Sequence, residues 1–418
     1  MKTIYIIEHY SSEPKYGGFS RQYNFANELS NHEYNVVVIS STFSHYTHSY
    51  FSDEKVFVNE LKPNFHYVYL RTPSYKANNG LGRIVSMIFF LFAVLANEAR
   101  LVSQYGRPDV VIGSSIHPLA WVAAEIISRK YRSLFCAEVR DFWPRIWVVA
   151  GERSRFSPVV MALYAIEKHA FKRANRVIHT MKHGDGYICG ELGISKEKTF
   201  WIGQPMDCGR FNENKMNKEK IPEKIRDFIK DSFVCTFAGY YMIYEGVYVM
   251  LGAAKLLKEK GLPIRMVFVG SGKEKDGMLK YVKDNALDNV LIYDRIDKEI
   301  VPALLSNSAV CMAHLEIKNH KDVYKYGASK NKVIEYLYSG ACTVYGASYS
   351  NEVNESKGGF CFEPYDEQSL ADVIEKIYYM PLEERIRIAQ RGRKYIEREH
   401  DVKVLTKKLE SVISMKNC

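Results

Sequence analysis

The stretch Tyr326-Gly-Ala-Ser-Lys-Asn-Lys-Val-Ile-Glu-Tyr-Leu-Tyr-Ser-Gly-Ala-Cys-Thr-Val-Tyr345 has the pattern of a loop, a helix, a glycine stop and a strand. Ser329 is a favourable N-cap and Gly340 a favourable C-terminal stop, so we expect the helix between them. Lys330 and Lys332 would then lie in the first turn, where the helix dipole disfavours cations unless an anion binds among them. The stretch therefore predicts an anion site at the start of this helix.

The same helix would present a carboxylate one turn after its cations. Asn331, Lys332 and Glu335 are spaced so that they share one helical face. The opposite face is apolar and is expected to be core: Val333, Ile334 and Leu337. A phosphate followed by a polyol is what a nucleotide ribose presents, so a nucleotide site is one interpretation. A solvated helix with surface charges is the other, and this stretch alone leaves both open.

Length and composition indicate a soluble protein of two domains. The chain has 418 residues, whereas single hydrophobic cores stop growing at roughly 250–300 residues. Hydrophobic residues make up 47% and charged residues 25%, as in ordinary globular proteins. The eight cysteines have no CxxC spacing, so we expect buried reduced thiols rather than a zinc site or a disulfide framework. No N-terminal signal is expected, because the first apolar run ends at Glu8.

The charge balance predicts an anionic partner. The formal net charge is +10, which attracts nucleic acid, anionic membranes and phosphorylated ligands alike. The sequence has no long block of like charges and no nucleic-acid-binding motif. We therefore expect an acidic surface or a phosphate-bearing ligand, and no nucleic acid.

The first half of the chain alternates strands with helices. A buried strand at 3–7 precedes a loop with Gly17 and Gly18, and a helix at 19–29 follows. A glycine pair at such a turn lets the backbone approach a ligand, although a plain tight turn explains it equally well. The pair is not a GxGxxG fingerprint, so no dinucleotide cofactor is expected.

A second candidate site in this half follows the strand expected at 134–139. Arg140 and Asp141 come directly after it. Charged groups just past the carboxyl end of a strand lie where α/β sheets bind ligands. The alternative is an Arg–Asp pair that braces the loop.

A polar segment at 212–230 marks the expected domain boundary, and a second alternating series follows it. Strands alternating with helices imply parallel sheets, so the predicted fold class is α/β, with two doubly wound Rossmann-like domains facing across a cleft. The expected divisions are an N-terminal domain at 1–211, a C-terminal domain at 212–385, and helices at 386–418 that pack back toward the N-terminal domain.

The run from 84 to 96 is strongly apolar and follows Arg83. It is too short to span a bilayer, which needs about 20 residues. We expect a buried helix. The alternative is a helix whose outer face dips into a membrane surface.

Four motifs resemble the retaining family-4 glycosyltransferases of the GT-B architecture, over nearly the whole chain. The closest likeness is to bacterial transferases that build surface polysaccharide repeat units. The motifs are the Gly17-Gly18 loop, Glu138-Val-Arg-Asp-Phe-Trp-Pro144, Phe268-Val-Gly-Ser-Gly272 and Gly327-Ala-Ser-Lys-Asn-Lys-Val-Ile-Glu-Tyr336.

The resemblance implies transfer of a sugar, with retention, from a nucleotide-sugar donor of the UDP type to a glycan or lipid-linked acceptor. It implies donor-binding roles for Gly17, Gly18, Gly239, Gly270, Arg295, Ser329, Lys330, Asn331, Lys332 and Glu335. Arg140 and Asp141 would face the acceptor or the transferred sugar. No metal or cofactor is expected, since the sequence has no DxD motif and cations can neutralise the leaving diphosphate.

The sequence departs from the family pattern at four places. Gly327 stands where the first of two glutamates is usual, so only the ribose-binding role carries over, to Glu335. Lys330 stands in place of the subgroup's proline, and Arg140 in place of a frequent histidine. The loop 239–246 lacks the usual phosphate-binding cations.

Two other functions remain open: a nucleotide-sugar 2-epimerase on the same fold, and a degenerate transferase that binds nucleotide-sugar without turnover. The net charge and the apolar run suggest a cytoplasmic protein on the inner face of the cell membrane.

Overall fold

The computed structural model describes residues 1–17, 21–45, 47–76, 80–115 and 117–415, and the chain divides into two compact units. Unit 1 comprises Met1–Pro205 and Val402–Cys418, and unit 2 comprises Met206–Asp401. The first division thus follows residue 205, where the sequence suggested 211. Of the expected C-terminal segment 386–418, residues 386–401 belong to unit 2 and the remainder to unit 1.

Unit 1 is built on an eight-stranded sheet with the order β3-β4-β2-β1-β5-β6-β7-β8. All neighbouring strands are parallel except β3 and β4, which form an antiparallel edge pair. The strands are β1 (Lys2–Ile7), β2 (Tyr34–Ser41), β3 (Val56–Lys62), β4 (Phe65–Leu70), β5 (Val110–Ser114), β6 (Leu134–Val139), β7 (Arg176–His179) and β8 (Thr199–Trp201).

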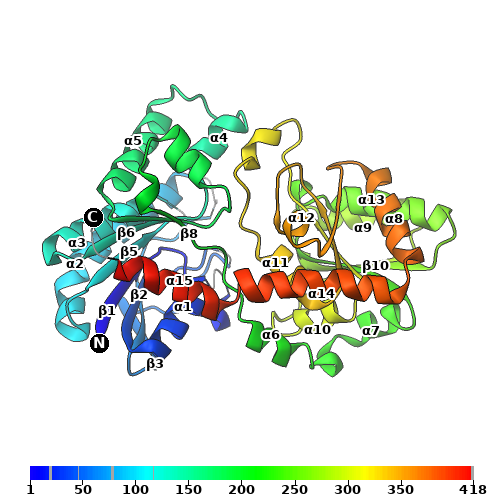
Figure 1. Cartoon of the computed structure of the whole chain (residues 1–418), viewed down its shortest axis with the longest axis horizontal. Coiled ribbons are helices and arrows are strands. Elements are labelled where there is room, and N and C mark those ends of the chain that lie inside the picture. Colours follow the sequence, from blue (N-terminus) through cyan, green and yellow to red (C-terminus); the bar gives the residue numbers. More distant parts are fainter. Residues whose placement is uncertain (18–20, 46, 77–79, 116, 416–418) are drawn as a thin grey trace. The chain divides into compact units, whose positions relative to one another are not determined.

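The helices of unit 1 form two groups of neighbours. Helices α1 and α15 lie side by side, and α2 packs on α3, which also contacts α5 (Figure 1). α15 contributes Leu405, Leu409 and Val412 to the core cluster that also holds Ile4 and Ile6 of β1. The helices are α1 (Arg21–Leu29), α2 (Leu81–Tyr105), α3 (Leu119–Tyr131), α4 (Arg145–Val149), α5 (Pro158–Arg173) and α15 (Val402–Ser414).

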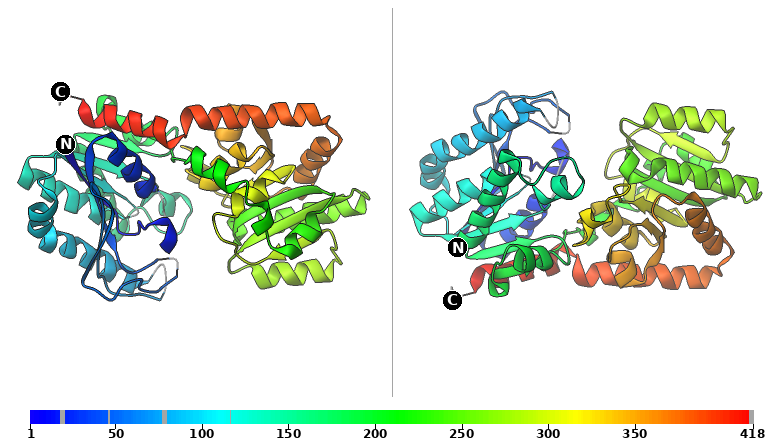
Figure 2. Two further views of the ribbon diagram at one scale, coloured as in Figure 1. Left: turned by 90° about the horizontal axis from the view of Figure 1, so that it is seen from below. Right: turned by 90° about the horizontal axis from the view of Figure 1, so that it is seen from above.

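Unit 2 has a six-stranded sheet, β11-β10-β9-β12-β13-β14, in which every neighbouring pair is parallel (Figure 2). The strands are β9 (Phe233–Tyr240), β10 (Ile264–Ser271), β11 (Val290–Tyr293), β12 (Val310–His314), β13 (Cys342–Gly346) and β14 (Gly359–Phe362). Two α/β units with parallel sheets are therefore confirmed.

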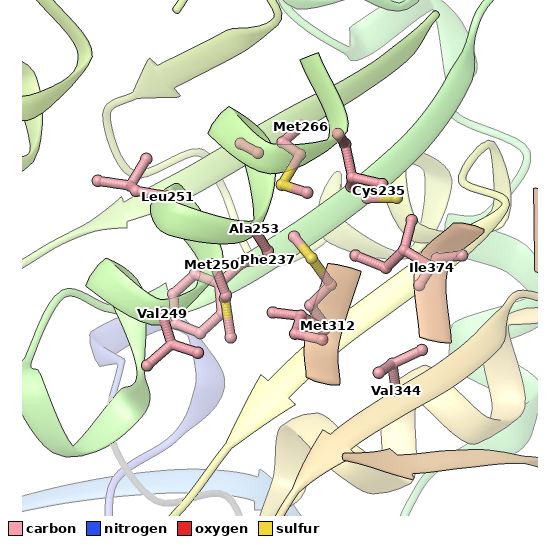
Figure 3. Packing of buried hydrophobic residues seen from close by; sticks show 14 of the residues in the cluster. Cys235, Phe237, Val249, Met250, Leu251, Ala253, Met266, Met312, Val344 and Ile374 are labelled. Carbon is pink, nitrogen blue, oxygen red and sulfur yellow. The ribbon is translucent and has the colours of Figure 1, made fainter. Parts of the chain in front are cut away.

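Side chains of β12 alternate between two cores, as expected for a strand covered on both faces. Met312 packs with Met250 of α8 and Ile374 of α13 (Figure 3), whereas Cys311 packs on the α11 side with Leu337. The helices of unit 2 are α6 (Cys208–Asn214), α7 (Glu223–Ile229), α8 (Val247–Glu259), α9 (Lys275–Asp284), α10 (Val301–Ser306), α11 (Asn331–Ser339), α12 (Glu352–Ser356), α13 (Glu367–Tyr379) and α14 (Leu382–Glu399).

The polar segment 212–230 is structured and belongs to unit 2. Two short helices, α6 and α7, occupy most of it. Phe211, Ile221 and Ile225 are buried in clusters of unit 2, which anchors the segment despite its polar composition.

Helix α2 differs most from expectation. The apolar run 84–96 is part of a 25-residue helix, long and apolar enough by length and composition to cross a membrane. The expectation of a buried helix is wrong for its N-terminal half, because a run of large apolar side chains there is exposed.

Candidate functional site

The candidate site lies at the carboxyl edge of the unit 2 sheet. Three segments reach this edge: a loop after β9 that includes a short 3-10 helix at Ile243–Glu245, the residues that follow β12, and the start of α11. Because all six strands are parallel, these segments extend from the same edge of the sheet, where α/β folds bind ligands.

The start of α11 lies one residue later than predicted. Lys330 is the N-cap, with extended backbone at φ −107°, and its side chain makes no capping bond. Ser329 therefore lies outside the helix, and its prediction as the N-cap is wrong. Ser329 Oγ and Asn331 Oδ1 are both buried and have no hydrogen-bond partner among the described residues. Buried polar atoms are normally paired, so this helix end offers two groups for a ligand.

Both predicted lysines converge on a carboxylate that the sequence analysis did not assign to the site. Lys332 Nζ lies 2.6 Å from Glu245 Oε2, and Lys330 Nζ lies 3.3 Å from Glu245 Oε1. Glu245 is buried, whereas its two partners are half-buried. The loop 239–246 lacks cations, as noted, but it supplies the anion that gathers the cations of α11.

The charges of this cluster are strongly coupled. Burial alone would raise the pKa of Glu245, but Lys332 and Lys330 outweigh burial, and the net shift is downward. Burial lowers the pKa of Lys332, and the nearby Lys330 adds to that effect while Glu245 opposes it. Two lysine side chains thus meet one carboxylate, so the cluster holds more basic than acidic groups.

Glycines at two strand ends make room for this cluster. A methyl group on Gly239 would overlap Lys332 Nζ, and one on Gly270 would overlap the carbonyl of Gly239. The two glycines are register partners on β9 and β10. Lys332 Nζ also lies 4.5 Å from the ring centre of Phe237, a distance suited to a cation–π contact.

Glu335 lies one turn after the lysines, as predicted, and is half-buried. It makes no hydrogen bond or ion pair with the other described residues. Burial raises the pKa of its carboxyl, while Lys298 and Lys332 act in the opposite direction. Arg295, predicted to join this group, is exposed in the loop after the edge strand β11, and its role in donor binding stays a prediction. Lys298, which the sequence analysis did not select, is the cation of that loop that acts on Glu335.

Two further residues, His314 at the end of β12 and Glu316 just after it, were not anticipated. His314 Nδ1 donates to the Tyr244 carbonyl at 2.9 Å, and burial lowers the pKa of this histidine. Its Nε2 atom is buried without a partner among the described residues, as is Glu316 Oε1. Glu316 Oε2 accepts from the backbone and hydroxyl of Ser348. The sequence did contain a signal for them, because polar residues at the carboxyl end of a buried strand lie where α/β sheets bind ligands.

In unit 1, Arg140 is buried and its Nη1 lies 3.2 Å from Glu8 Oε1, whereas Asp141 is exposed. The two predicted residues thus have different environments. Burial raises the pKa of Glu8 to about 7, although Arg140 opposes the shift. Glu8 and Arg140 follow the carboxyl ends of β1 and β6 directly, so the ion pair joins these two strand ends.

A second buried network surrounds these residues. Glu138 accepts from Arg21 at 2.7 Å, from Gln22 at 2.9 Å and from Ser114 at 2.5 Å. His9 Nδ1 lies 3.0 Å from His117 Nε2, and the His9 ring stacks on Phe90 of α2. Glu138 therefore braces the sheet edge, which explains a glutamate at the first position of the Glu138–Pro144 motif.

The glycine pair of the first loop is only half described. Gly17 ends a short 3-10 helix at Pro14–Tyr16 with φ 73°, a conformation that favours glycine. Gly18 lies outside the described residues. Among the residues that the structure describes, no group of three His, Cys, Asp or Glu side chains is placed to hold a metal ion.

Sequence comparison relates this chain to one family model and to one characterised relative. Residues 232–379 match the model of a family described as Glycosyl transferases group 1. The capsular polysaccharide biosynthesis glycosyltransferase CapM of Staphylococcus aureus is 23% identical over 258 residues, which are 60% of this chain and 64% of CapM. The match therefore spans less than two thirds of that relative.

Solved structures share the fold over nearly the full length. Sucrose-phosphate synthase from Thermosynechococcus elongatus has a TM-score of 0.73 at 15% identity, over 99% of this chain and 98% of its own. HepE of Anabaena in complex with UDP has a TM-score of 0.68 at 14% identity, over 99% and 100%. These likenesses establish the two-domain GT-B fold. The segment from β9 to α13, which contains the Glu245–Lys332 cluster, is the part of the chain that matches this family model.

Proposed function

We propose that the chain transfers a sugar from a nucleotide-sugar donor to an acceptor hydroxyl, with retention at the anomeric carbon, as a family-4 enzyme. One observation carries the proposal: the start of α11 holds two lysines paired with Glu245, and its Ser329 Oγ and Asn331 Oδ1 are buried with no partner in the described part of the chain. A helix N-terminus with added cations is suited to a diphosphate.

The leaving group of this reaction is a nucleoside diphosphate, on which negative charge grows as the glycosidic bond breaks. Preorganised donors and cations stabilise such charge. Lys330, Lys332 and the free N–H groups of α11 would stabilise this charge. Because these groups can neutralise the diphosphate, the proposed transfer requires no metal ion. Glu335, one turn later and without a hydrogen-bond partner among the described residues, would accept hydrogen bonds from the ribose hydroxyls.

We propose UDP as the nucleotide and a glycan or lipid-linked saccharide as the acceptor. HepE binds UDP on the same fold, and CapM is a transferase of capsular polysaccharide synthesis, which supports a role in bacterial surface polysaccharide synthesis. The buried Glu8–Arg140 pair lies at the carboxyl edge of the unit 1 sheet. We propose that it shapes the acceptor site there and takes no part in the chemical step. The proposed location is the cytoplasm, at the inner face of the cell membrane.

The proposal is tested by donor binding and turnover of Lys332→Ala and Glu335→Ala. Both variants should bind UDP more weakly, by about tenfold for the loss of one charged hydrogen bond. Lys280→Ala, an exposed lysine on α9, is the matched control and should bind as the parent does. Unchanged UDP affinity and turnover in both site variants would reject the site.

Product analysis distinguishes the other two functions. A transferase forms glycosylated product only when acceptor is present, whereas an epimerase converts the donor alone. UDP binding without product over a panel of acceptors would indicate a binding protein, and the proposed reaction would be wrong.

A further inference from the structure

Helix α2 has two apolar sides, and only one of them packs on unit 1. Its buried residues, among them Phe90, Val94 and Leu101, recur at helical spacing on one face. On the opposite face six large side chains are exposed: Leu81, Ile84, Val85, Ile88, Phe89 and Phe92. Their spacing of three and four residues forms one stripe over the first half of the helix. Phe92 is 62% exposed and Leu81 81% exposed, so this stripe is an uncovered apolar surface.

The surroundings of this stripe are basic. From Arg71 to Asn97 the chain contains no acidic residue. Arg71 borders the helix and also pairs with the exposed Asp53 at 3.2 Å, whereas Arg83 turns inward and donates to the Tyr10 hydroxyl at 3.1 Å. A groove of about 600 Å³ runs beside the helix. Phe89 and Ala93 line it together with three basic residues, Lys55, Arg71 and Arg100. Apolar and cationic groups thus meet along one side of α2.

The fold excludes α2 as a membrane-spanning segment although its length suffices. β4, before the helix, pairs with β2, and β5, after it, pairs with β1. β1 and β2 are themselves neighbours in the same sheet. A helix that crossed a bilayer would place β4 and β5 on opposite sides of the membrane, which one continuous sheet does not allow.

We propose that the exposed face of α2 lies in the surface of an anionic lipid bilayer, parallel to its plane. The stripe would enter the boundary between headgroups and acyl chains, and Lys55, Arg71 and Arg100 would contact lipid phosphates. Helices with one apolar face and a basic border bind membranes in this way, roughly 5–10 Å deep. The net charge of +10 favours an anionic surface over a neutral one.

This surface adjoins the edge of unit 1 at which the candidate residues lie. Phe90, on the inner face of α2, stacks on His9, just beyond the carboxyl end of β1. His9 in turn contacts His117, beyond β5. A bilayer on the outer face of α2 would therefore lie one helix thickness from this edge, within reach of a lipid-linked acceptor. The inference rests on the proposed membrane location, but its test requires no glycosyl transfer.

The test is sedimentation of the full chain with vesicles of phosphatidylcholine alone and of phosphatidylcholine mixed with phosphatidylglycerol. We expect binding to the anionic vesicles, weakened by salt because the lipid charge is screened. Phe89→Ser combined with Phe92→Ser should weaken it about tenfold, since two partly exposed aromatic rings no longer transfer into lipid. Lys55→Gln combined with Arg100→Gln should weaken binding to anionic vesicles only.

Matched controls lie in unit 2. Tyr379 and Leu382 are as exposed as the two phenylalanines, so Tyr379→Ser with Leu382→Ser should bind vesicles as the parent does. Lys224→Gln with Lys280→Gln is the charge control. Absence of binding to either vesicle at low salt, or equal loss in test and control variants, overturns the proposal. A concentration-dependent dimer that the phenylalanine variant abolishes, without vesicle binding, would assign the stripe to a second copy of the chain and also overturn it.

Discussion

Glu245→Gln isolates the charge at the centre of the unit 2 site. The change keeps the shape of the side chain and removes the only anion paired with Lys330 and Lys332 in the described cluster. In the ligand-free protein the two ammonium groups then repel each other without a carboxylate between them. In the proposed complex, the diphosphate takes over part of that role.

The expected cost follows from burial. Glu245 is 5% exposed, and removing one partner of a buried ion pair costs about 3–5 kcal/mol. Because the side chain of Lys330 is 27% exposed and water relieves part of its charge, we expect the lower end, about 3 kcal/mol. For a unit of this size, that corresponds to a decrease in Tm of about 6–12 °C, at 2–4 °C for each kcal/mol.

UDP should reverse part of this loss. Removing a like charge from beside a bound diphosphate strengthens its binding, and we expect UDP affinity to rise about tenfold. The rise in Tm caused by UDP should accordingly be larger in Glu245→Gln than in the parent protein, since the stabilisation by a ligand grows with the logarithm of its concentration divided by Kd. Differential scanning fluorimetry with and without UDP measures both effects.

Glu299→Gln is the control. Glu299 Oε1 lies 2.7 Å from Arg210 Nη2, nearly the distance of the buried pair, but the Glu299 side chain is 62% exposed. Exposed pairs contribute about 0–1 kcal/mol, so this variant should unfold almost as the parent does. Equal decreases in Tm for the two variants would refute the electrostatic reasoning. A smaller UDP-induced shift in Glu245→Gln than in the parent would refute the placement of the diphosphate at these lysines.

Three further outcomes are expected. Gly239→Ala should displace the flexible end of Lys332 from Glu245, so that the urea midpoint falls and UDP affinity, measured by calorimetric titration, falls about tenfold. Glu138→Ala leaves Arg21 buried without its carboxylate and should destabilise unit 1 by about 3–5 kcal/mol, seen by calorimetry as a lowered transition for one unit only. Burial raises the pKa of Glu167 to about 8, so the folded state binds a proton that the unfolded state releases. From pH 8 to 6.5 this group should add about 2 kcal/mol of stability as pH falls. Glu167→Gln should remove that share of the slope in urea titrations, and an unchanged slope would contradict the assignment.

The alternation of strands and helices was predictable because it depends on local periodicity. The strand expected at 134–139 coincides with β6, and the strand expected at 3–7 differs from β1 by one residue. The assignment of the last helices was not predictable in the same way, because α14 and α15 are similarly amphipathic and only tertiary packing divides them between the units. The prediction of a buried helix over 84–96 was wrong for a related reason. Apolar composition does not show which side of a helix packs on the protein and which side is exposed.

The site was predictable where chemistry and helical spacing coincide, as at Lys332 and Glu335. Glu245 was not predicted because it lies in a short loop without periodicity. Its role depends on a tertiary contact, since Lys332 of α11 packs against that loop. The N-cap assignment of Ser329 was wrong because capping preference alone does not fix where a helix begins. Lys330 takes the extended conformation there instead.

Helix α15 completes the core of unit 1 although it follows unit 2 in the chain. During synthesis, residues 1–205 therefore leave the ribosome without the side chains that Leu405 and Leu409 contribute, while the whole of unit 2 can emerge and fold first. Nascent domains with exposed apolar surface are prone to aggregation and chaperone binding. The order of maturation is thus the reverse of the order of translation: the second unit is finished before the first. A chain that terminates before residue 402 would leave the first unit permanently unfinished.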